Sequence, residues 1–394
     1  MNSSWRNNNT SPQSVPEITP WELVRVLESG EKIQIVDVRA PAGAEGGVAG
    51  LIREEWVHHI VGSDLLRRSS LSSAGLDSAS PVVVICAHGN DSKVATEHLN
   101  QLGASARSLQ GGMAAWMALS IGRELATPES LDGLVQFDRV GKEALSYLLL
   151  SDGQALIIDP PRDFTAHLRY IDEAGARLVA VADTHAHADF ISGASSISKE
   201  RGVPYYLHPA DTIYPYDETP GRLKTVPSDP GMSIRVGRCD LAVLHTPGHS
   251  LGSVTYLLDD EAAFTGDFLF ITSVGRPDLA AKTDAWSRVL WKSIQAVKSS
   301  WQAGLMIYPA HYTSQTPRHR GGAIGEPFAQ LLLQNRSLRM SEESEFTLWI
   351  KQHEKAVPAA YRSIKGINVG LLSVGDREAD LLENGKNECA VGDN

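Results

Sequence analysis

The chain has 394 residues, which is too many for one ordinary hydrophobic core, so we expect two domains. Hydrophobic residues make up 42% and charged residues 21%, a composition typical of globular proteins. The formal net charge is −11, from 36 basic and 47 acidic side chains, which argues against nucleic acid or an anionic membrane surface as a partner.

The N-terminus and the cysteines bear on location. Residues 1–15 are rich in Asn, Ser and Pro and lack the apolar core of a signal peptide, so we expect a disordered leader. No apolar run approaches the roughly 20 residues that cross a bilayer. Three cysteines cannot make a disulfide framework and suit a reducing cytosol, so the protein is expected to be cytoplasmic.

Residues 16–124 alternate short β-branched strands with helical stretches. Strands are expected at 33–38, at 81–85 and near 108–109, with an amphipathic helix after the second. Such alternation predicts an α/β domain with a parallel sheet, whose ligands bind at the carboxyl ends of the strands.

Cys86 lies in the loop between the second of these strands and the following helix. A thiol at that place faces unpaired backbone N–H groups and the positive end of a helix, and both favour the reactive thiolate. Gly89 lets the loop curl so that its amides point inward. The alternative is a buried core cysteine, against which stands its position after the strand rather than within it.

This segment resembles a single rhodanese domain. The resemblance rests on Asp37-Val38-Arg39, on the Cys86 loop and on the stretch from Leu109 to Trp116. It implies that Cys86 accepts a sulfane sulfur and carries it as a persulfide. The usual loop has Arg where this chain has Asp91, which disfavours the dianion thiosulfate, so we expect a persulfide carrier rather than a thiosulfate:cyanide enzyme.

A polar stretch at 125–132 is predicted to link this domain to a second one at 133–375, followed by a polar, disordered tail at 376–394. The second domain begins with a hairpin at 147–158 and continues with a helix at 164–174. Strand-like pieces follow at 179–183, 205–207, 241–245, 254–258, 262–265 and 305–308. This mixture predicts an α+β domain of layered sheets covered by helices.

His and Asp residues recur directly after these strands, flanked by small residues that permit tight turns. They occur in four segments and comprise His185, His187, Asp189, His249, Asp267 and His311. Imidazoles and carboxylates that converge from separate strand ends predict a metal site. A single histidine in such a place would more often be structural, but four segments repeat the arrangement.

The four segments resemble the metallo-β-lactamase superfamily, which implies an αββα sandwich. In that family the first metal position corresponds to His185, His187 and His249, with Asp267 able to bridge. A second position would use Asp189, His311 and the last His of a His-x-His-x-Asp-His motif. That residue is Phe190 here, and a phenyl ring cannot ligate a metal. We therefore expect the second site to be vestigial, because it lacks a ligand that dinuclear zinc hydrolysis needs.

The loss favours a persulfide dioxygenase of the ethylmalonic-encephalopathy-protein-like branch, which uses one iron. The resemblance implies one Fe²⁺ per chain on His185, His249 and Asp267, with His187 close by, and a thiol persulfide such as glutathione persulfide and O₂ as substrates. Arg276 would lie near the substrate and pair with a carboxylate of the thiol; the alternative is a structural salt bridge to Asp278 or another acid.

Two other functions stay open on the sequence. One is a glyoxalase II-like thioesterase that uses zinc, and the other is a non-catalytic sulfur-relay or sensor protein. The sequence does not give the direction of sulfur flow through Cys86. Relatives of this fold often pair, so a homodimer is one expectation that the sequence leaves open.

Overall fold

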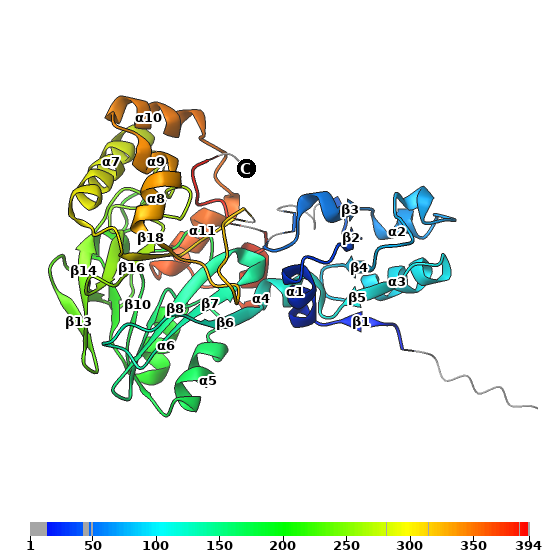
Figure 1. Cartoon of the computed structure of the whole chain (residues 1–394), viewed down its shortest axis with the longest axis horizontal. Coiled ribbons are helices and arrows are strands. Elements are labelled where there is room, and N and C mark those ends of the chain that lie inside the picture. Colours follow the sequence, from blue (N-terminus) through cyan, green and yellow to red (C-terminus); the bar gives the residue numbers. More distant parts are fainter. Residues whose placement is uncertain are drawn as a thin grey trace, which may run out of the picture. The chain divides into compact units, whose positions relative to one another are not determined.

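The computed structural model of the chain describes residues 14–41, 47–48, 50–280, 282–313, 315–385 and 387–392. The chain divides into two compact units, Met1–Leu119 and Ser120–Asn394 (Figure 1). Residues 1–13 of the predicted leader lie outside the described residues. Among the described helices, none has the length and apolar character that a membrane span needs.

The first unit contains a five-stranded parallel sheet in the order β1-β5-β4-β2-β3. Its strands are β1 (Glu17–Ile18), β2 (Gln34–Asp37), β3 (Val57–His59), β4 (Val82–Ile85) and β5 (Ala106–Leu109), and its α-helices are α1 (Pro20–Glu28), α2 (Gly62–Leu65), α3 (Asp91–Gln101) and α4 (Gly112–Ala118). Strands β2 and β4 are buried along their whole length. This parallel α/β domain confirms the predicted fold class.

The second unit contains two sheets. The first has seven strands in the order β12-β11-β10-β9-β8-β7-β6, and the second has six in the order β13-β14-β15-β16-β17-β18. The strands of the first are β6 (Ser120–Glu124), β7 (Gly133–Arg139), β8 (Ala144–Ser151), β9 (Gln154–Ile158), β10 (Arg177–Ala182), β11 (Tyr205–Leu207) and β12 (Val226–Pro227). Those of the second are β13 (Ser233–Val236), β14 (Cys239–His245), β15 (Val254–Leu258), β16 (Ala262–Gly266), β17 (Met306–Pro309) and β18 (Glu326–Pro327).

The two sheets of the second unit share one hydrophobic core. Residues from both meet there, such as Tyr147 and Leu156 from the first sheet and Tyr256 and Phe264 from the second. Alternate side chains of a strand point to opposite faces, so each sheet has a second apolar face to cover. Helices cover these outer faces, and the result is the αββα sandwich that the family resemblance implies.

Helices lie on both outer faces of this sandwich (Figure 1). On the first sheet, Ile171 and Ile197 pack against a cluster that includes Leu148 and Ile157. The helices are α5 (Thr165–Glu173), α6 (Ala194–Arg201), α7 (Thr283–Ser300), α8 (Phe328–Gln334), α9 (Arg336–Arg339), α10 (Glu343–Gln352), α11 (Ala359–Asn368) and α12 (Asp376–Leu382).

The division between the units differs from the predicted boundary at residue 124. Strand β6 pairs antiparallel with β7 and so belongs to the second unit. Residues 125–132, predicted to be an interdomain linker, instead connect two strands of one sheet, and Leu131 within them is buried in the shared core. The prediction rested on polar composition, which does not reveal that β6 pairs with β7 or that Leu131 is buried.

The predicted disordered tail at 376–394 also differs from the structure, although residues 386, 393 and 394 lie outside the described part. Residues 376–382 form α12, and Glu383 is 3% exposed because it pairs with Arg139 at 2.9 Å. Cys389 is fully buried. A polar composition hid this order because the buried polar groups find specific partners.

Candidate metal centre

Six side chains predicted as metal ligands lie just beyond the carboxyl ends of strands in the second unit. They follow β10, β14, β16 and β17 and are His185, His187, Asp189, His249, Asp267 and His311. Each is at most 2% exposed. Strands β16 and β17 are parallel, so Asp267 and His311 leave the second sheet at the same end.

Two glycines give the loops room to place these ligands. Gly248, before His249, has φ of 146°, and a Cβ there would lie 2.4 Å from the Cα of Leu290 on α7. Gly266, before Asp267, has φ of 53°, and its Cβ would lie 2.3 Å from Oγ1 of Thr184. Any larger side chain would strain the backbone and displace the neighbouring ligand.

The first cluster consists of His185, His249 and Asp267, whose candidate ligand atoms all lie within 4.8 Å of one another. Oδ2 of Asp267 is 3.7 Å from Nε2 of His185 and 3.5 Å from Nε2 of His249. The Nδ1 atom of His249 donates to the carbonyl oxygen of Arg276 at 3.0 Å, and that of His185 is hydrogen-bonded to Oγ1 of Thr184 at 3.0 Å. These bonds orient the Nε2 atoms toward Asp267.

Three buried polar atoms of this cluster lack hydrogen-bond partners among the described residues. They are Nε2 of His185 and both carboxylate oxygens of Asp267. Leaving buried polar atoms unpaired costs free energy, and a metal ion would compensate that cost. The donor set therefore fits a metal, as the metallo-β-lactamase fold implies.

Protonation of the first cluster also suits a cation. Burial lowers the pKa of His185 and His249 well below the usual value, and the nearby Lys365 ammonium adds to the effect. Both imidazoles are therefore neutral at physiological pH, the form that ligates. Burial raises the pKa of Asp267 to about 6.

A second cluster lies beside the first and contains His187, Asp189 and His311. Nε2 of His311 is 3.4 Å from Asp189 and 3.4 Å from Asp267, so Asp267 lies between the clusters. Burial opposes a charge on His311, but Asp189 and Asp267 outweigh it and raise its pKa to about 9. Both oxygens of Asp189 and Nε2 of His311 lack hydrogen-bond partners among the described residues.

His187 groups with Asp189 and His311, and its ring also lies beside that of His185 in the first cluster, with a centroid distance of 4.2 Å. The Nε2 atom of His187 contacts Oδ1 of Asp159 at 3.1 Å. In His185 and His249 it is instead the Nδ1 atom that is hydrogen-bonded to a supporting group. Phe190 stacks on the His187 ring with a centroid distance of 4.1 Å, and its ring is 6.3 Å from that of His311. The position of the absent motif histidine is thus filled by an apolar ring.

Two buried acids that the sequence reasoning missed support the ligand loops. Asp159 accepts hydrogen bonds from the backbone N–H of Thr184 at 2.7 Å and from its hydroxyl. Asp211 accepts from the N–H groups of Ala186 and Gly252, at 2.7 and 2.9 Å. A lone acid has no sequence spacing that marks it as a supporting residue. The only sequence signal for either acid was the position of Asp159 directly after a predicted strand.

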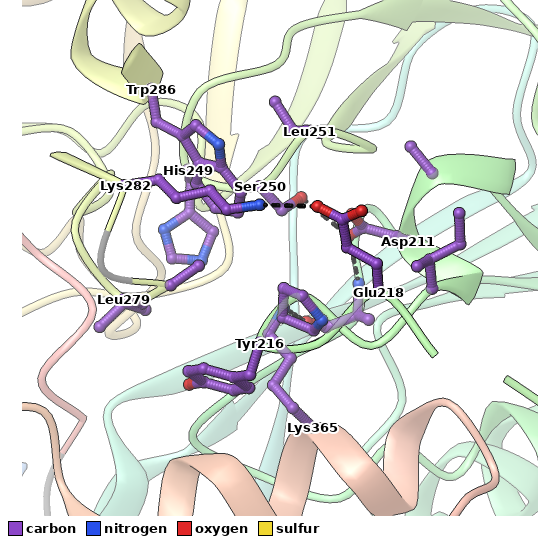
Figure 2. Close-up of a pocket in the computed structure, with 15 residues that line it drawn as sticks. Asp211, Tyr216, Glu218, His249, Ser250, Leu251, Leu279, Lys282, Trp286 and Lys365 are labelled. Carbon is purple, nitrogen blue, oxygen red and sulfur yellow. Dashed lines mark hydrogen bonds and ion pairs between the residues drawn. The ribbon is translucent and has the colours of Figure 1, made fainter. Parts of the chain in front are cut away.

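A cavity of about 310 Å³ opens on the first cluster at His249 (Figure 2). Its lining is largely apolar, with Leu251, Leu279 and Trp286 among the residues around His249. Lys282 and Glu218 form an ion pair at 3.2 Å across one side. The buried Lys365 also lines the cavity, and its ammonium donates to the carbonyl oxygen of Ala186 in the metal loop.

Arg276, expected near the substrate, is instead 1% exposed and does not line this cavity. Its guanidinium contacts both oxygens of Asp278 at 2.9 and 2.6 Å. It also donates to the carbonyl oxygens of Lys355 and Glu388. These contacts correspond to the structural salt bridge that the sequence left open as the alternative, since a buried guanidinium needs a partner.

In the first unit, Cys86 lies where the sequence places it, between β4 and α3, and is 2% exposed. Its Sγ accepts a hydrogen bond from the N–H of Gly89 at 3.1 Å and is hydrogen-bonded to Oγ of Ser92 at 3.1 Å. Gly112 packs on this loop: a Cβ there would lie 2.4 Å from the carbonyl oxygen of Cys86. The loop therefore provides donors directed at the thiol.

Two families match the chain. Residues 19–119 match the rhodanese-like domain, and residues 140–316 match the metallo-beta-lactamase superfamily. A solved metallo-beta-lactamase from Staphylococcus aureus subsp. aureus COL is 26% identical with a TM-score of 0.52, covering 65% of this chain and 74% of that one.

Curated relatives match part of the chain. "Probable metallo-hydrolase YqgX" of Bacillus subtilis is 34% identical over 150 residues, covering 35% of this chain and 71% of the relative. The human mitochondrial persulfide dioxygenase ETHE1 is 33% identical over 175 residues, covering 40% of this chain but only 59% of the relative's length. The chain therefore belongs to the metallo-β-lactamase superfamily, with a rhodanese-like domain ahead of that fold.

Proposed function

We propose that the chain is an iron-dependent persulfide dioxygenase that converts a thiol persulfide and dioxygen into sulfite and the free thiol. The first cluster carries the proposal, because it brings two imidazoles and one carboxylate together, and Nε2 of His185 and both oxygens of Asp267 have no hydrogen-bond partner among the described residues. Two His and one carboxylate form the ligand set of non-haem Fe(II) oxygenases. The similarity of part of the chain to a human persulfide dioxygenase supports the same assignment.

The overall reaction is R–S–S⁻ + O₂ + H₂O → R–S⁻ + SO₃²⁻ + 2 H⁺. The terminal sulfur is oxidised, dioxygen is reduced, and the sulfur–sulfur bond is broken. An iron(II) ion held by His185, His249 and Asp267 would supply the one-electron chemistry that dioxygen needs to react with sulfur.

The cavity residues have the task of binding and positioning the persulfide. The apolar side chains of Leu251 and Trp286 beside His249 would accommodate the thiol's carbon chain. Lys365 places a positive charge in the same cavity, where it can pair with the anionic persulfide. Holding the reactants together at this position contributes through proximity.

Cys86 is proposed to carry sulfane sulfur, with the Gly89 N–H and the Ser92 hydroxyl stabilising the terminal anion. One transfer available to it is R–S–S⁻ + SO₃²⁻ → R–S⁻ + S₂O₃²⁻, which moves the terminal sulfur to sulfite. The Cys86→Ser variant should lose this thiosulfate formation and keep dioxygen consumption. Undiminished thiosulfate would remove Cys86 from the scheme. We also propose a cytoplasmic location, because the three cysteines of the chain are free thiols and the cytoplasm is reducing.

A thioesterase of the glyoxalase II type is the second candidate, and the second cluster favours it. Asp189 and His311 could take part in binding another ion for two-metal hydrolysis, and the B. subtilis relative bears a metallo-hydrolase name. One protein sample offered glutathione persulfide and a glutathione thioester separates the two. Dioxygen consumed and sulfite formed in equal amounts support the dioxygenase, whereas thioester cleavage without dioxygen consumption supports the hydrolase.

A further inference from the structure

The C-terminal segment, residues 383–392 except residue 386, lies against the metal centre and is held by hydrogen bonds. Ala390 bridges antiparallel to Gly275, and the N–H of Val391 donates to the carbonyl oxygen of Val274 at 2.9 Å. The buried ammonium of Lys142 donates to the carbonyl oxygen of Gly385 at 3.1 Å. Because these hydrogen bonds fix both ends of the segment, the position of the residues between them is also constrained.

Cys389 lies in the middle of this segment, and residues outside the segment contact it on two sides. Its carbonyl oxygen accepts from the N–H of Arg276 at 2.7 Å. The N–H of the preceding residue, Glu388, donates to the hydroxyl of Tyr361 at 2.8 Å, and Sγ of Cys389 lies 3.9 Å from the same hydroxyl. Its exposed fraction is 0%.

This placement brings Sγ of Cys389 to the junction of the two clusters. Sγ and candidate ligand atoms of Asp267 and His311 all lie within 4.8 Å of one another. Both Asp267 oxygens and Nε2 of His311 lack hydrogen-bond partners among the described residues, as do the oxygens of Asp189 beside them. The thiol therefore faces buried polar atoms whose contacts to one another, at 3.4 Å, leave them without a hydrogen bond among the described residues.

The other buried cysteine of this unit provides a contrast. Cys239 lies on β14 among the apolar side chains of the shared core, the common environment of a free cysteine. Cys389 has some apolar neighbours, such as Ala188 and Leu279, but it also borders an acid and an imidazole with open coordination. Packing alone accounts for Cys239 and does not account for Cys389.

We propose that Cys389 is a ligand of a second metal position, together with His311 and Asp189, with Asp267 shared between both positions. The thiolate takes the place of the imidazole that Phe190 lacks. A sulfur ligand selects a thiophilic divalent transition ion, such as Zn²⁺, Co²⁺ or Fe²⁺, over Mg²⁺ or Ca²⁺. The ligands differ from those of the dioxygenase proposal except for Asp267, so this inference goes beyond that function.

The test is an anaerobic titration of the metal-free full-length protein with Co²⁺, because a thiolate ligand gives a charge-transfer absorption in the near ultraviolet. We expect the chain to bind a second equivalent together with this band. Cys389→Ser should bind only the first equivalent, without the band. Cys239→Ala and Cys86→Ser, matched removals of the other thiols, should keep both. A band that survives in Cys389→Ser, or a parent chain that binds one ion without a band, overturns the proposal.

Two further measurements guard against a variant that simply misfolds. In the unchanged chain, Co²⁺ should protect Cys389 from alkylation, measured by mass spectrometry; equal labelling with and without Co²⁺ would contradict the proposal. The double variant Phe190→His/Cys389→Ser should regain the second equivalent without the thiolate band. A chain that binds this ion yet never consumes dioxygen would keep this inference and lose the proposed function.

Discussion

Replacing Arg276 by methionine should destabilise the second unit and loosen its C-terminal segment. Arg276 is 1% exposed and makes two contacts to the buried Asp278. Removing one partner of a buried ion pair costs about 3–5 kcal/mol, because the other charge remains without compensation. At about 4 kcal/mol, the equilibrium constant for opening rises roughly a thousandfold. The hydrogen bond to the carbonyl oxygen of Glu388 at 3.2 Å is lost as well.

The assay combines denaturant unfolding with hydrogen exchange of peptides covering the C-terminal segment. Arg276→Met should lower the free energy of unfolding of the second unit and remove exchange protection around Cys389. Arg288→Met is the matched control: Arg288 is 66% exposed and its ion pair with Glu343 spans 3.8 Å, so a change below about 1 kcal/mol is expected. Unchanged stability and protection, with a raised KM for the persulfide, would refute this reasoning and restore a substrate-binding role for Arg276.

Three further predictions concern separate sites. Gly248→Ala places a Cβ 2.4 Å from the Cα of Leu290, so it should displace His249 and lower metal content after dialysis; full metal retention would contradict the backbone argument. Burial lowers the pKa of His167 to about 3. Below a pH of about 6.5 the unfolded chain therefore binds a proton at this imidazole that the folded chain does not bind. Stability should fall by roughly 2 kcal/mol from pH 7 to 5, and His167→Gln should remove that part of the slope in denaturant titrations. Lys365→Met should raise KM for an anionic persulfide about tenfold, worth about 1.4 kcal/mol, and Lys365→Arg should recover part of it; an unchanged KM would mean that the ammonium serves the metal loop alone.

The sequence singles out His and Asp residues that the structure gathers into two buried clusters, because the residue type and the local structure coincide there. His185, His249, Asp267 and His311 each follow a strand and are accompanied by small residues, so both their type and their position carry information. In the second sheet β14, β16 and β17 run in the same direction, so His249, Asp267 and His311 leave it at the same end.

The parts that sequence reasoning missed depend on contacts between distant segments. Asp211 is an isolated acid whose partners, Ala186 and Gly252, lie 25 and 41 residues away. The contact between Nε2 of His187 and Asp159 joins residues 28 positions apart, and no spacing reveals it. The position of Cys389 depends on hydrogen bonds to remote segments, so a polar composition suggested disorder instead.

The most direct test of the central claim is dioxygen uptake by one batch of metal-free protein reconstituted separately with iron(II) and with zinc. Glutathione, coenzyme A and cysteine persulfides would be supplied in turn. The account predicts dioxygen consumption with sulfite only in the iron sample, and loss of both in His249→Ala. Absence of uptake with every persulfide while iron is bound, together with thioester cleavage by the zinc sample, would contradict it.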